Sequence, residues 1–65
     1  MKTGFVKNTI NEINTDWIGG YSAKEDGGKI KVLLNEEVVA EVNEDYKVSG
    51  SDESAVKQLE FMVNR

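Results

Sequence analysis

Three pairs of adjacent acidic residues within positions 36–53 are the feature of this sequence whose type and spacing could do chemistry. The pairs are Glu36 with Glu37, Glu44 with Asp45, and Asp52 with Glu53. Neighbouring carboxylates serve in other proteins as metal ligands or as acid–base groups. A calcium loop needs alternating ligands, a central glycine and a terminal glutamate, and none of the three pairs lies in such a pattern. We therefore expect no metal site and no cofactor.

Two residue types on which most catalytic sites rely are absent from the sequence. There is no histidine, the commonest general base and metal ligand, and no cysteine, which excludes thiol nucleophiles, disulfides and thiolate zinc sites. The glycine pairs at 19–20 and 27–28 match neither a phosphate-binding loop nor a dinucleotide fingerprint. The sequence therefore predicts a protein that acts by binding and is not an enzyme.

Charge is distributed unevenly along the chain, and its acidic part is a candidate binding surface. Residues 36–53 carry seven acidic residues and one lysine, a net charge of −6, whereas residues 1–31 carry a net charge of +1. An acidic stretch repels nucleic acid and attracts a basic protein surface. The alternative is that the stretch only keeps the protein soluble. The acidic candidates for partner binding are Glu36, Glu37, Glu41, Glu44, Asp45, Asp52 and Glu53.

Two amphipathic helices are predicted to flank the part of the chain that holds these residues. The first covers 4–14, because apolar residues recur at helical spacing from Val6 to Trp17, and Thr3 is a suitable N-cap. The second follows Ser51, another suitable cap, and has acidic residues in its first turn, where the helix dipole favours them. Its core-facing stripe consists of Ala55, Val56, Leu59, Met62 and Val63.

Three strands are predicted between the helices, at 17–23, 29–34 and 38–42. A chain of 65 residues forms one domain with a thin core. The expected fold of this single domain, residues 1–65, is α+β with the order α-β-β-β-α. A three-stranded antiparallel meander has one apolar face, and both helices are expected to pack on it.

The strand registers are predicted from the requirement that apolar residues share one face. A two-residue turn at 26–27, an Asp-Gly pair, places Ala23 opposite Ile30. A three-residue loop at 35–37 is favoured for the second hairpin, because a shorter turn would mix apolar and charged residues. The pairs expected there are Leu34 with Val38, Val32 with Ala40, Lys31 with Glu41 and Ile30 with Val42.

Some apolar residues fall outside the expected core. Phe61 lies on the face of the second helix opposite Leu59, so it is either an anchor for a partner or folds back onto the domain. Ile18, Leu33 and Val39 are expected to form a small patch on the outer face of the sheet.

Trp17 and Tyr21 are aromatic residues of the type that stacks on nucleic-acid bases. The expected register places both side chains on the inner face of the sheet, and no basic residue adjoins them. We interpret both as core residues.

The predicted order of elements resembles that of double-stranded RNA-binding domains. Residues 29–42 are similar to the second hairpin of that family, and residues 51–63 to the start of its closing helix. The family binds RNA through lysines at the start of that helix, where this chain has Ser-Asp-Glu-Ser at 51–54. The resemblance therefore implies a shared fold without the residues that contact RNA.

The element order, the short length and the acidic stretch also resemble small phage-encoded anti-CRISPR proteins. Some members are acidic, lack catalytic residues and place carboxylates where the target nuclease would hold nucleic acid. This resemblance implies an inhibitor with a basic target. A third resemblance is to antitoxins with a three-stranded sheet and a helix.

Together these observations predict a small acidic inhibitor or adaptor, of phage or mobile-element type, that engages a basic surface on a nucleic-acid-handling protein. The acidic candidates and Phe61 would form its contact surface. One alternative is an RNA-binding module that uses the five lysines of residues 1–31, and another is a self-associating structural subunit that uses the outer sheet face. No apolar run is long enough for a signal peptide or a membrane helix, so we expect a cytoplasmic protein without a membrane partner.

Overall fold

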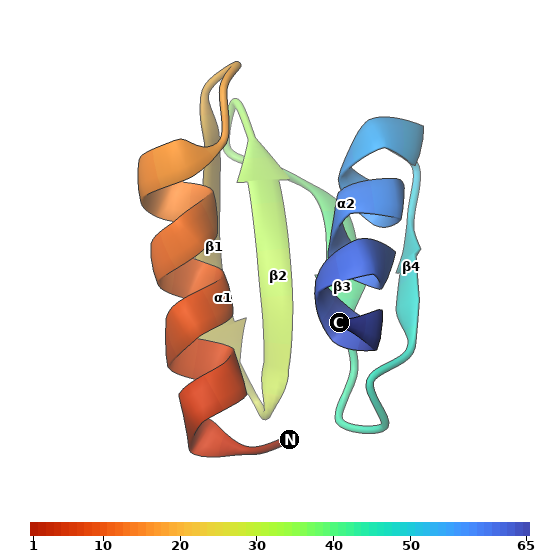
Figure 1. Ribbon diagram of the computed structural model, residues 1–65. Helices are drawn as coiled ribbons and strands as arrows, with labels where there is room; N and C mark the ends of the chain where they lie inside the picture. Colours follow the sequence, from red (N-terminus) through yellow and green to blue (C-terminus); the bar gives the residue numbers. More distant parts are fainter.

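The computed structural model describes all 65 residues and contains a helix, a four-stranded antiparallel sheet and a second helix (Figure 1). The elements in chain order are α1 (Thr3–Asp16), β1 (Tyr21–Asp26), β2 (Lys29–Leu34), β3 (Glu37–Val42), β4 (Val48–Gly50) and α2 (Glu53–Asn64). The strands lie side by side in sequence order. The predicted α+β class is confirmed, and the sheet has four strands where three were predicted.

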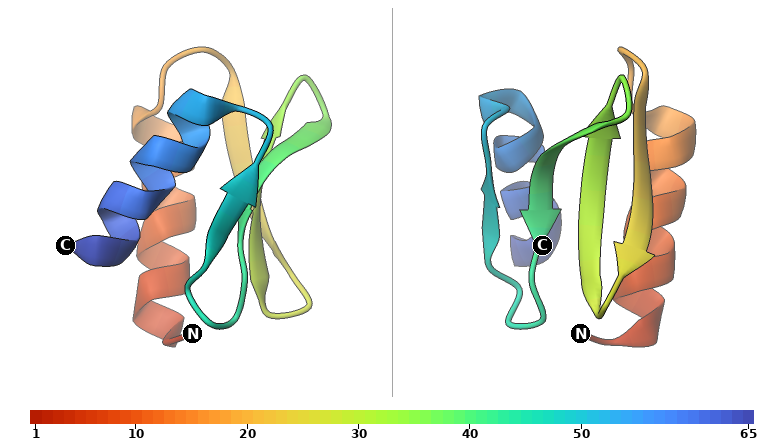
Figure 2. Two further views of the ribbon diagram at one scale, coloured as in Figure 1. Left: turned by 90° about the vertical axis from the view of Figure 1, so that its right-hand side faces the viewer. Right: turned by 180° about the vertical axis from the view of Figure 1, so that it is seen from behind.

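Both helices lie on the same face of the sheet, as predicted. Helix α1 packs across β1, and α2 packs across β3 and β4, so each helix covers one half of the sheet (Figure 2). The opposite face of the sheet is not covered by any element. Neither helix has the length and apolar character needed to cross a membrane.

The fourth strand is the element that the sequence did not predict. In β4, Val48 lies opposite Val42 and Gly50 opposite Ala40. The strand has only three residues and a single large apolar side chain, which is too short a pattern to indicate a strand. It becomes visible only through its pairing with β3.

The register of the first hairpin differs from the prediction by two residues. Ala23 lies opposite Val32, where Ile30 was predicted. The turn residues are the two glycines at 27–28, which have positive φ, and not the Asp-Gly pair at 26–27. Because side chains alternate with a period of two, a shift of two residues leaves the inner and outer faces unchanged.

The second hairpin confirms three of its four predicted pairs. The confirmed pairs are Ile30 with Val42, Lys31 with Glu41 and Val32 with Ala40. The prediction of Leu34 opposite Val38 is wrong, because the turn contains two residues, 35–36, and Leu34 lies opposite Glu37. A β-bulge at Val39 accommodates the additional residue and restores the register beyond it.

The core lies between the sheet and the two helices. Its buried apolar residues are Val6, Ile13, Ala23, Ile30, Val32, Ala40, Val42, Ala55, Leu59 and Met62. The predicted helical stripes are confirmed, since each helix contributes buried residues at helical spacing. Complete burial of one such aliphatic side chain contributes about 1.5–3 kcal/mol, a large share of the stability of so small a domain.

The two helix N-termini differ from the prediction by one residue each. Helix α1 begins at Thr3, and its N-cap is Lys2, which makes no side-chain capping bond. The N-cap of α2 is Asp52 and not Ser51, because Oδ1 of Asp52 accepts a hydrogen bond from the Ala55 N–H at 3.1 Å. A charge-assisted cap of this kind also matches the positive end of the helix dipole.

The connection between α1 and β1 is a loop over residues 17–20. Trp17 leaves the helix in an extended conformation, and the strand predicted from residue 17 begins only at Tyr21. The two glycines at 19–20 have positive φ, which ends the extended segment before the sheet starts. Trp17 therefore lies at the end of the helix and not in the sheet.

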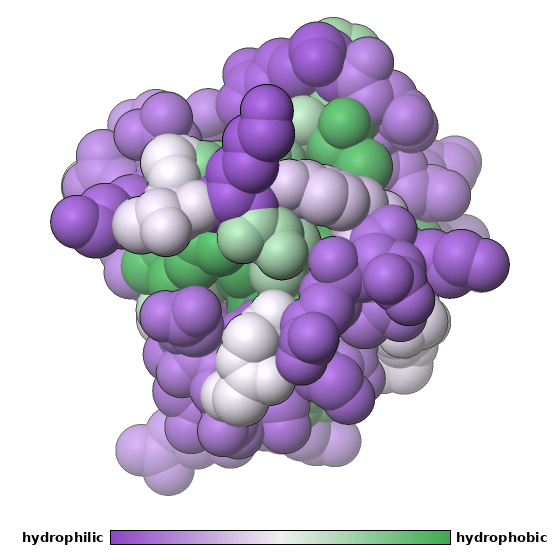
Figure 3. Space-filling view, turned by 90° about the horizontal axis from the view of Figure 1, so that it is seen from below, coloured by the Kyte–Doolittle hydropathy of each residue, from purple (hydrophilic) through white to green (hydrophobic).

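The lower end of the molecule in Figure 1 is closed by an aromatic pair. Phe5 and Tyr46 pack edge to face with ring centroids 5.2 Å apart, and the Tyr46 hydroxyl accepts a hydrogen bond from the backbone N–H of Lys2 at 2.9 Å. Asn43 orders the β3–β4 turn, since its Oδ1 accepts from the N–H of Asp45 at 2.9 Å. Viewed from this end, hydrophobic residues lie in a recess among hydrophilic ones (Figure 3).

Candidate functional site

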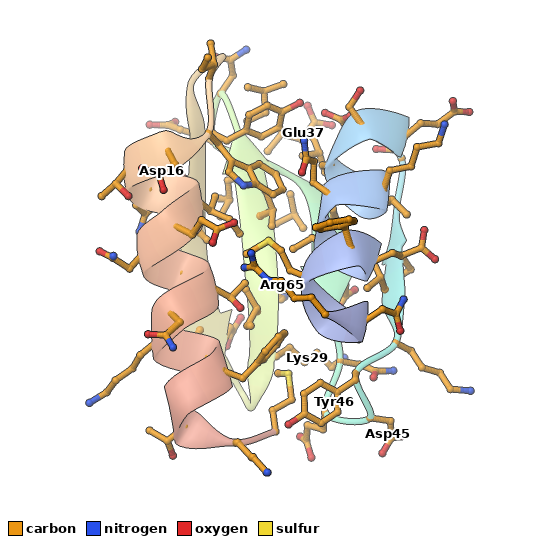
Figure 4. The ribbon with its side chains drawn as sticks, in the orientation of Figure 1. Asp16, Lys29, Glu37, Asp45, Tyr46 and Arg65 are labelled. Carbon is orange, nitrogen blue, oxygen red and sulfur yellow. The ribbon has the colours of Figure 1, made fainter.

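The seven acidic candidates do not form one surface, because an antiparallel meander places successive turns at opposite ends of the sheet. The end at which α1 terminates and α2 begins is named the upper end, after its position in Figure 1. Its carboxylates are Asp16, Glu36, Glu37, Asp52 and Glu53. Glu44 and Asp45 lie in the β3–β4 turn at the lower end, and Figure 4 shows Asp45 there, far from Asp16 and Glu37.

The two ends differ sharply in net charge. The segments that form the upper end are 16–21, 34–37 and 50–54, and they contain five acidic residues and no lysine or arginine. The segments that form the lower end are 1–3, 26–29 and 42–48, and they contain three acidic residues and three lysines. The uncompensated negative charge of this protein is therefore concentrated at the upper end.

Glu41 belongs to neither end. It lies on the outer face of the sheet, where its Oε2 is 3.9 Å from Nζ of Lys29. On the same face, Nζ of Lys31 is 3.3 Å from Oδ2 of Asp26. Exposed ion pairs of this kind contribute about 0.2–1 kcal/mol each, and they neutralise much of the charge on that face.

A groove of about 530 Å³ opens at the upper end between the last turns of α1 and the first turns of α2. We call it the interhelical groove. Its lining residues are Glu12, Asp16, Trp17, Ile18, Tyr21, Ser54, Ala55 and Gln58. The α1 wall is acidic, and the α2 wall carries a hydroxyl and an amide. Aromatic side chains lie between the two walls.

Trp17 and Tyr21 provide the aromatic part of the interhelical groove. Their rings pack edge to face, with centroids 5.4 Å apart and an interplanar angle of 83°. Both side chains are half-buried and pack against the core, so the core prediction holds for their inner surfaces. Their remaining surface faces the groove, where it is available to a ligand.

A hydrogen bond between Tyr21 and Asp52 joins β1 to the start of α2. The Tyr21 hydroxyl donates to Oδ2 of Asp52, while Oδ1 caps the helix. This bond raises the pKa of the Tyr21 phenol, and partial loss of solvent adds to the effect. The same bond lowers the pKa of the Asp52 carboxyl, and the Ala55 N–H lowers it further. At neutral pH the phenol therefore stays protonated and acts as a donor, and Asp52 stays charged with both oxygens engaged.

Phe61 is exposed on the outer side of α2, with 69% of its surface accessible, so of the two alternatives the one in which it folds back onto the domain is wrong. It lines a shallow hollow together with Ser54, Lys57 and Gln58. Ser54 and Gln58 also line the interhelical groove, so the two hollows share one wall of α2. On the other side, Ile18 is 93% exposed at the rim of the groove. Apolar groups therefore flank the groove on both sides.

The predicted outer patch has a different composition from the one expected. Ile18 lies in the α1–β1 loop and not on the sheet, and Val39 packs against the core because the bulge displaces it. Leu33 remains on the outer face, where it lies opposite Val38, which is 46% exposed. The patch therefore consists of one cross-strand pair, too small to indicate an interface by itself.

Comparisons with protein-family models, with curated proteins and with solved structures found no match to this chain. Within the structure, no three histidine, cysteine or acidic side chains come together in an arrangement that could hold a metal ion. The geometry of the upper end is therefore the basis for a functional proposal.

Several residues of the groove were not identified from the sequence. Glu12 and Asp16 are four residues apart in α1 and so lie on one face of the helix, directly before Trp17. That spacing could have indicated an acidic helix face next to an aromatic residue. Ser54 and Gln58 have the same i,i+4 spacing in α2, but only the packing of the two helices shows that the two faces oppose one another.

Proposed function

We propose that this chain is a small acidic binding protein that acts without catalysis, by engaging a basic surface on a nucleic-acid-handling protein in the cytoplasm. The observation that carries the proposal is the upper end, where five carboxylates without a lysine or arginine adjoin a groove that has aromatic side chains between its two walls. The carboxylates attract a basic surface over a distance of about 8–10 Å at moderate salt. The groove and the flanking Ile18 and Phe61 supply the apolar contacts that fix the position of the partner.

The role that this surface suits best is inhibition of the partner. A protein that closes the nucleic-acid site of an enzyme must present negative charge where phosphates would lie, on a frame that keeps the charges in place. The upper-end acidic residues lie in a strand turn, at a helix cap and at a helix terminus, so the backbone that carries them is part of ordered structure, and the Asp52 carboxylate is itself fixed by two hydrogen bonds. The role we propose is that of a phage or mobile-element inhibitor of a host defence enzyme, of the anti-CRISPR type.

Binding of RNA by the lysine residues is the second candidate, and it is less well supported. Lys24 and Lys31 lie opposite each other on the outer sheet face, and Lys29 is on the same face. However, Lys29 and Lys31 are paired with Glu41 and Asp26, which lowers the positive potential that a phosphate backbone requires. Only Lys24 is left without a carboxylate partner among the three.

The experiment that tests the proposal uses two matched double variants. E36Q/E37Q removes two adjacent charges from a turn at the upper end, and E44Q/D45N removes two from a turn at the lower end. Each form is immobilised and exposed to lysate of a host cell at about 50 mM and about 500 mM salt, concentrations at which the screening length is about 14 Å and about 4 Å. Captured proteins and nucleic acids are identified by mass spectrometry and sequencing.

We expect the native chain and E44Q/D45N to capture the same basic nucleic-acid-handling protein at low salt, and to release it at high salt. E36Q/E37Q should capture several-fold less, because the charges facing the partner are fewer. Equal loss in both variants, or capture that survives high salt in E36Q/E37Q, would contradict the proposal. Recovery of RNA alone would support the second candidate, and recovery of only the chain itself would support self-association.

A further inference from the structure

We infer that the interhelical groove accepts an arginine side chain of the partner, and that Arg65 occupies one of its carboxylates when no partner is bound. This inference rests on the proposed function and names the chemistry of its central contact. The occupant is defined by three features: an acidic wall, an aromatic surface, and an arginine of the chain itself that is paired with Glu12 of that wall.

The acidic wall consists of Glu12 and Asp16, one helical turn apart on the same face of α1. Asp16 has no ion-pair partner and accepts only a 3.3 Å hydrogen bond from the Thr15 hydroxyl. It is the last residue of α1, where the helix dipole is negative, and the last turn contains no basic residue. A negative side chain at this position is unfavourable by itself, and a bound cation would remove that repulsion.

The aromatic surface favours arginine over lysine. A guanidinium group is planar, so it can lie against the exposed part of Trp17 while its N–H groups face the Asp16 carboxylate. The last carbonyl groups of a helix also lack internal partners, and a guanidinium has five donors with which to reach them. An ammonium group is compact and strongly hydrated, and it would use the carboxylate alone.

Arg65 shows that Glu12, one of the two carboxylates of the wall, can pair with a guanidinium. Its Nη2 is 2.9 Å from Oε1 of Glu12, an ion pair that spans the space between α2 and α1 (Figure 4). The side chain of Arg65 is 55% exposed, so the pair is accessible to solvent and is exchanged at little cost. A partner arginine that displaces Arg65 would find both carboxylates of the wall free.

Trp17 is the single tryptophan of the chain, so its fluorescence reports occupancy of the groove directly. The probes are a blocked hexa-arginine peptide and a blocked hexa-lysine peptide of equal charge. We expect the arginine peptide to change Trp17 emission and to bind about fivefold more tightly than the lysine peptide, the ratio that one partly exposed cation–π contact provides. Equal affinities, or binding without a change in Trp17 emission, would overturn the inference.

Three variants separate the groove from general electrostatics. D16N should weaken hexa-arginine binding by about threefold to tenfold, through loss of a charge-assisted hydrogen bond. R65Q should strengthen it by about twofold to fivefold, because an exposed competing ion pair is removed. E44Q/D45N should leave it within about twofold, since the lower end is more than a screening length away. Weaker binding by R65Q, or equal weakening by D16N and E44Q/D45N, would contradict the inference.

The thermal stability of D16N distinguishes loss of the arginine contact from loss of structure. Removing a negative charge from the C-terminus of α1 should raise the midpoint of thermal unfolding while it weakens peptide binding. If D16N lowered both, a loss of structure would explain the result and the inference would fail.

The inference and the proposed function can fail separately. Loss of lysate capture in E36Q/E37Q, with no effect of D16N or R65Q on that capture, would leave the proposed function standing without the arginine site. Arginine-selective binding by the groove, with no upper-end-dependent capture from any lysate, would leave the site standing and overturn the proposed function.

Discussion

The side-chain amide of Asn14 makes both hydrogen bonds with Ala23 that a neighbouring strand would make. Its Oδ1 accepts from the Ala23 N–H at 2.8 Å, and its Nδ2 donates to the Ala23 carbonyl oxygen at 3.3 Å. Ala23 is in β1, the edge strand of the sheet, so these backbone groups point away from β2. An edge strand with free backbone groups is a template for pairing with another chain. Asn14 thus attaches α1 to the sheet and blocks the centre of its exposed edge.

Replacing Asn14 by alanine should therefore have two effects. Loss of the two hydrogen bonds should lower the free energy of unfolding by about 1–3 kcal/mol, measured by chemical denaturation. The unblocked edge should also increase concentration-dependent association, measured by sedimentation velocity. The matched control is N8A, because Asn8 is exposed on the same helix. If N14A and N8A were equally stable and equally monomeric, Asn14 would have no role at the edge.

Gly50 is the second position at which a single substitution should have a large effect on stability. It lies in β4 opposite Ala40, and an added Cβ would collide with the Val39 carbonyl oxygen and lie 2.6 Å from Cα of Ala40. Both are backbone atoms that cannot move aside. G50A should lower the free energy of unfolding by about 2 kcal/mol or more, as overpacking against rigid neighbours does. The matched control is G4A in the first turn of α1, where an added Cβ meets nothing within 4 Å; it should be neutral or stabilising, and equal losses in both variants would rule out the steric explanation.

The turn between β2 and β3 stores strain that a single substitution can relieve. Asn35 and Glu36 both have positive φ, 54° and 68°, which suits a tight hairpin turn but is unfavourable for glutamate. E36G should raise the free energy of unfolding by about 0.5–1 kcal/mol, because glycine adopts this conformation without a steric penalty. N35G should gain less, since asparagine tolerates the left-handed region. A loss of stability in E36G would show that the Glu36 side chain makes a contact that outweighs the strain.

The same substitution separates stability from binding. Glu36 is one of the upper-end carboxylates, so E36G should weaken capture of the proposed partner while it stabilises the fold. Opposite signs in the two measurements would be difficult to explain by partial unfolding.

The positions of the three acidic pairs within residues 36–53 illustrate what this sequence can reveal. The pairs are centred eight residues apart, at 36–37, 44–45 and 52–53. In an antiparallel meander that spacing corresponds to about one strand and its turn, so successive pairs fall at alternate ends of the sheet. The predicted meander already implied that neighbouring pairs lie at opposite ends. Because β4 was not predicted, the return of the chain to the upper end before residues 52–53 was not apparent. The helical stripes and the inner strand faces were predictable for the same reason, because burial imposes a period on the sequence.

Other features depend on packing that has no local signal. The bulge at Val39 could not be distinguished from a longer loop, because both give the same pairing of Ile30, Val32 and their partners in the middle of the hairpin. The groove exists only because α1 and α2 cover opposite halves of one sheet face, and the contact between Arg65 and Glu12 joins residues 53 positions apart. Neither helix by itself indicates its neighbour.

The bond between Tyr21 and Asp52 makes stability depend on pH in two windows. Asp52 has a lowered pKa in the folded chain, so its contribution is present above the unfolded pKa of about 3.9 and is lost as the pH falls through the lower folded pKa. Tyr21 has a raised pKa, so its contribution is present below the unfolded pKa of about 10 and is lost as the pH rises through the higher folded pKa. Between these limits both contributions are complete.

Y21F tests this dependence because it removes the hydroxyl and leaves the ring in place beside Trp17. We expect Y21F to be less stable than the native chain between about pH 5 and about pH 9, where the phenol is protonated and Asp52 is charged in both states. The difference in stability between the two chains should shrink below about pH 4, because Asp52 takes up a proton, and above about pH 10, because the Tyr21 phenol loses one. Denaturant midpoints measured from pH 2 to pH 11 provide the test, and subtracting one chain from the other cancels the groups that they share. A difference that stayed constant over the whole range would mean that the hydroxyl contributes through packing alone, and that Asp52 is held by its helix cap without help from Tyr21.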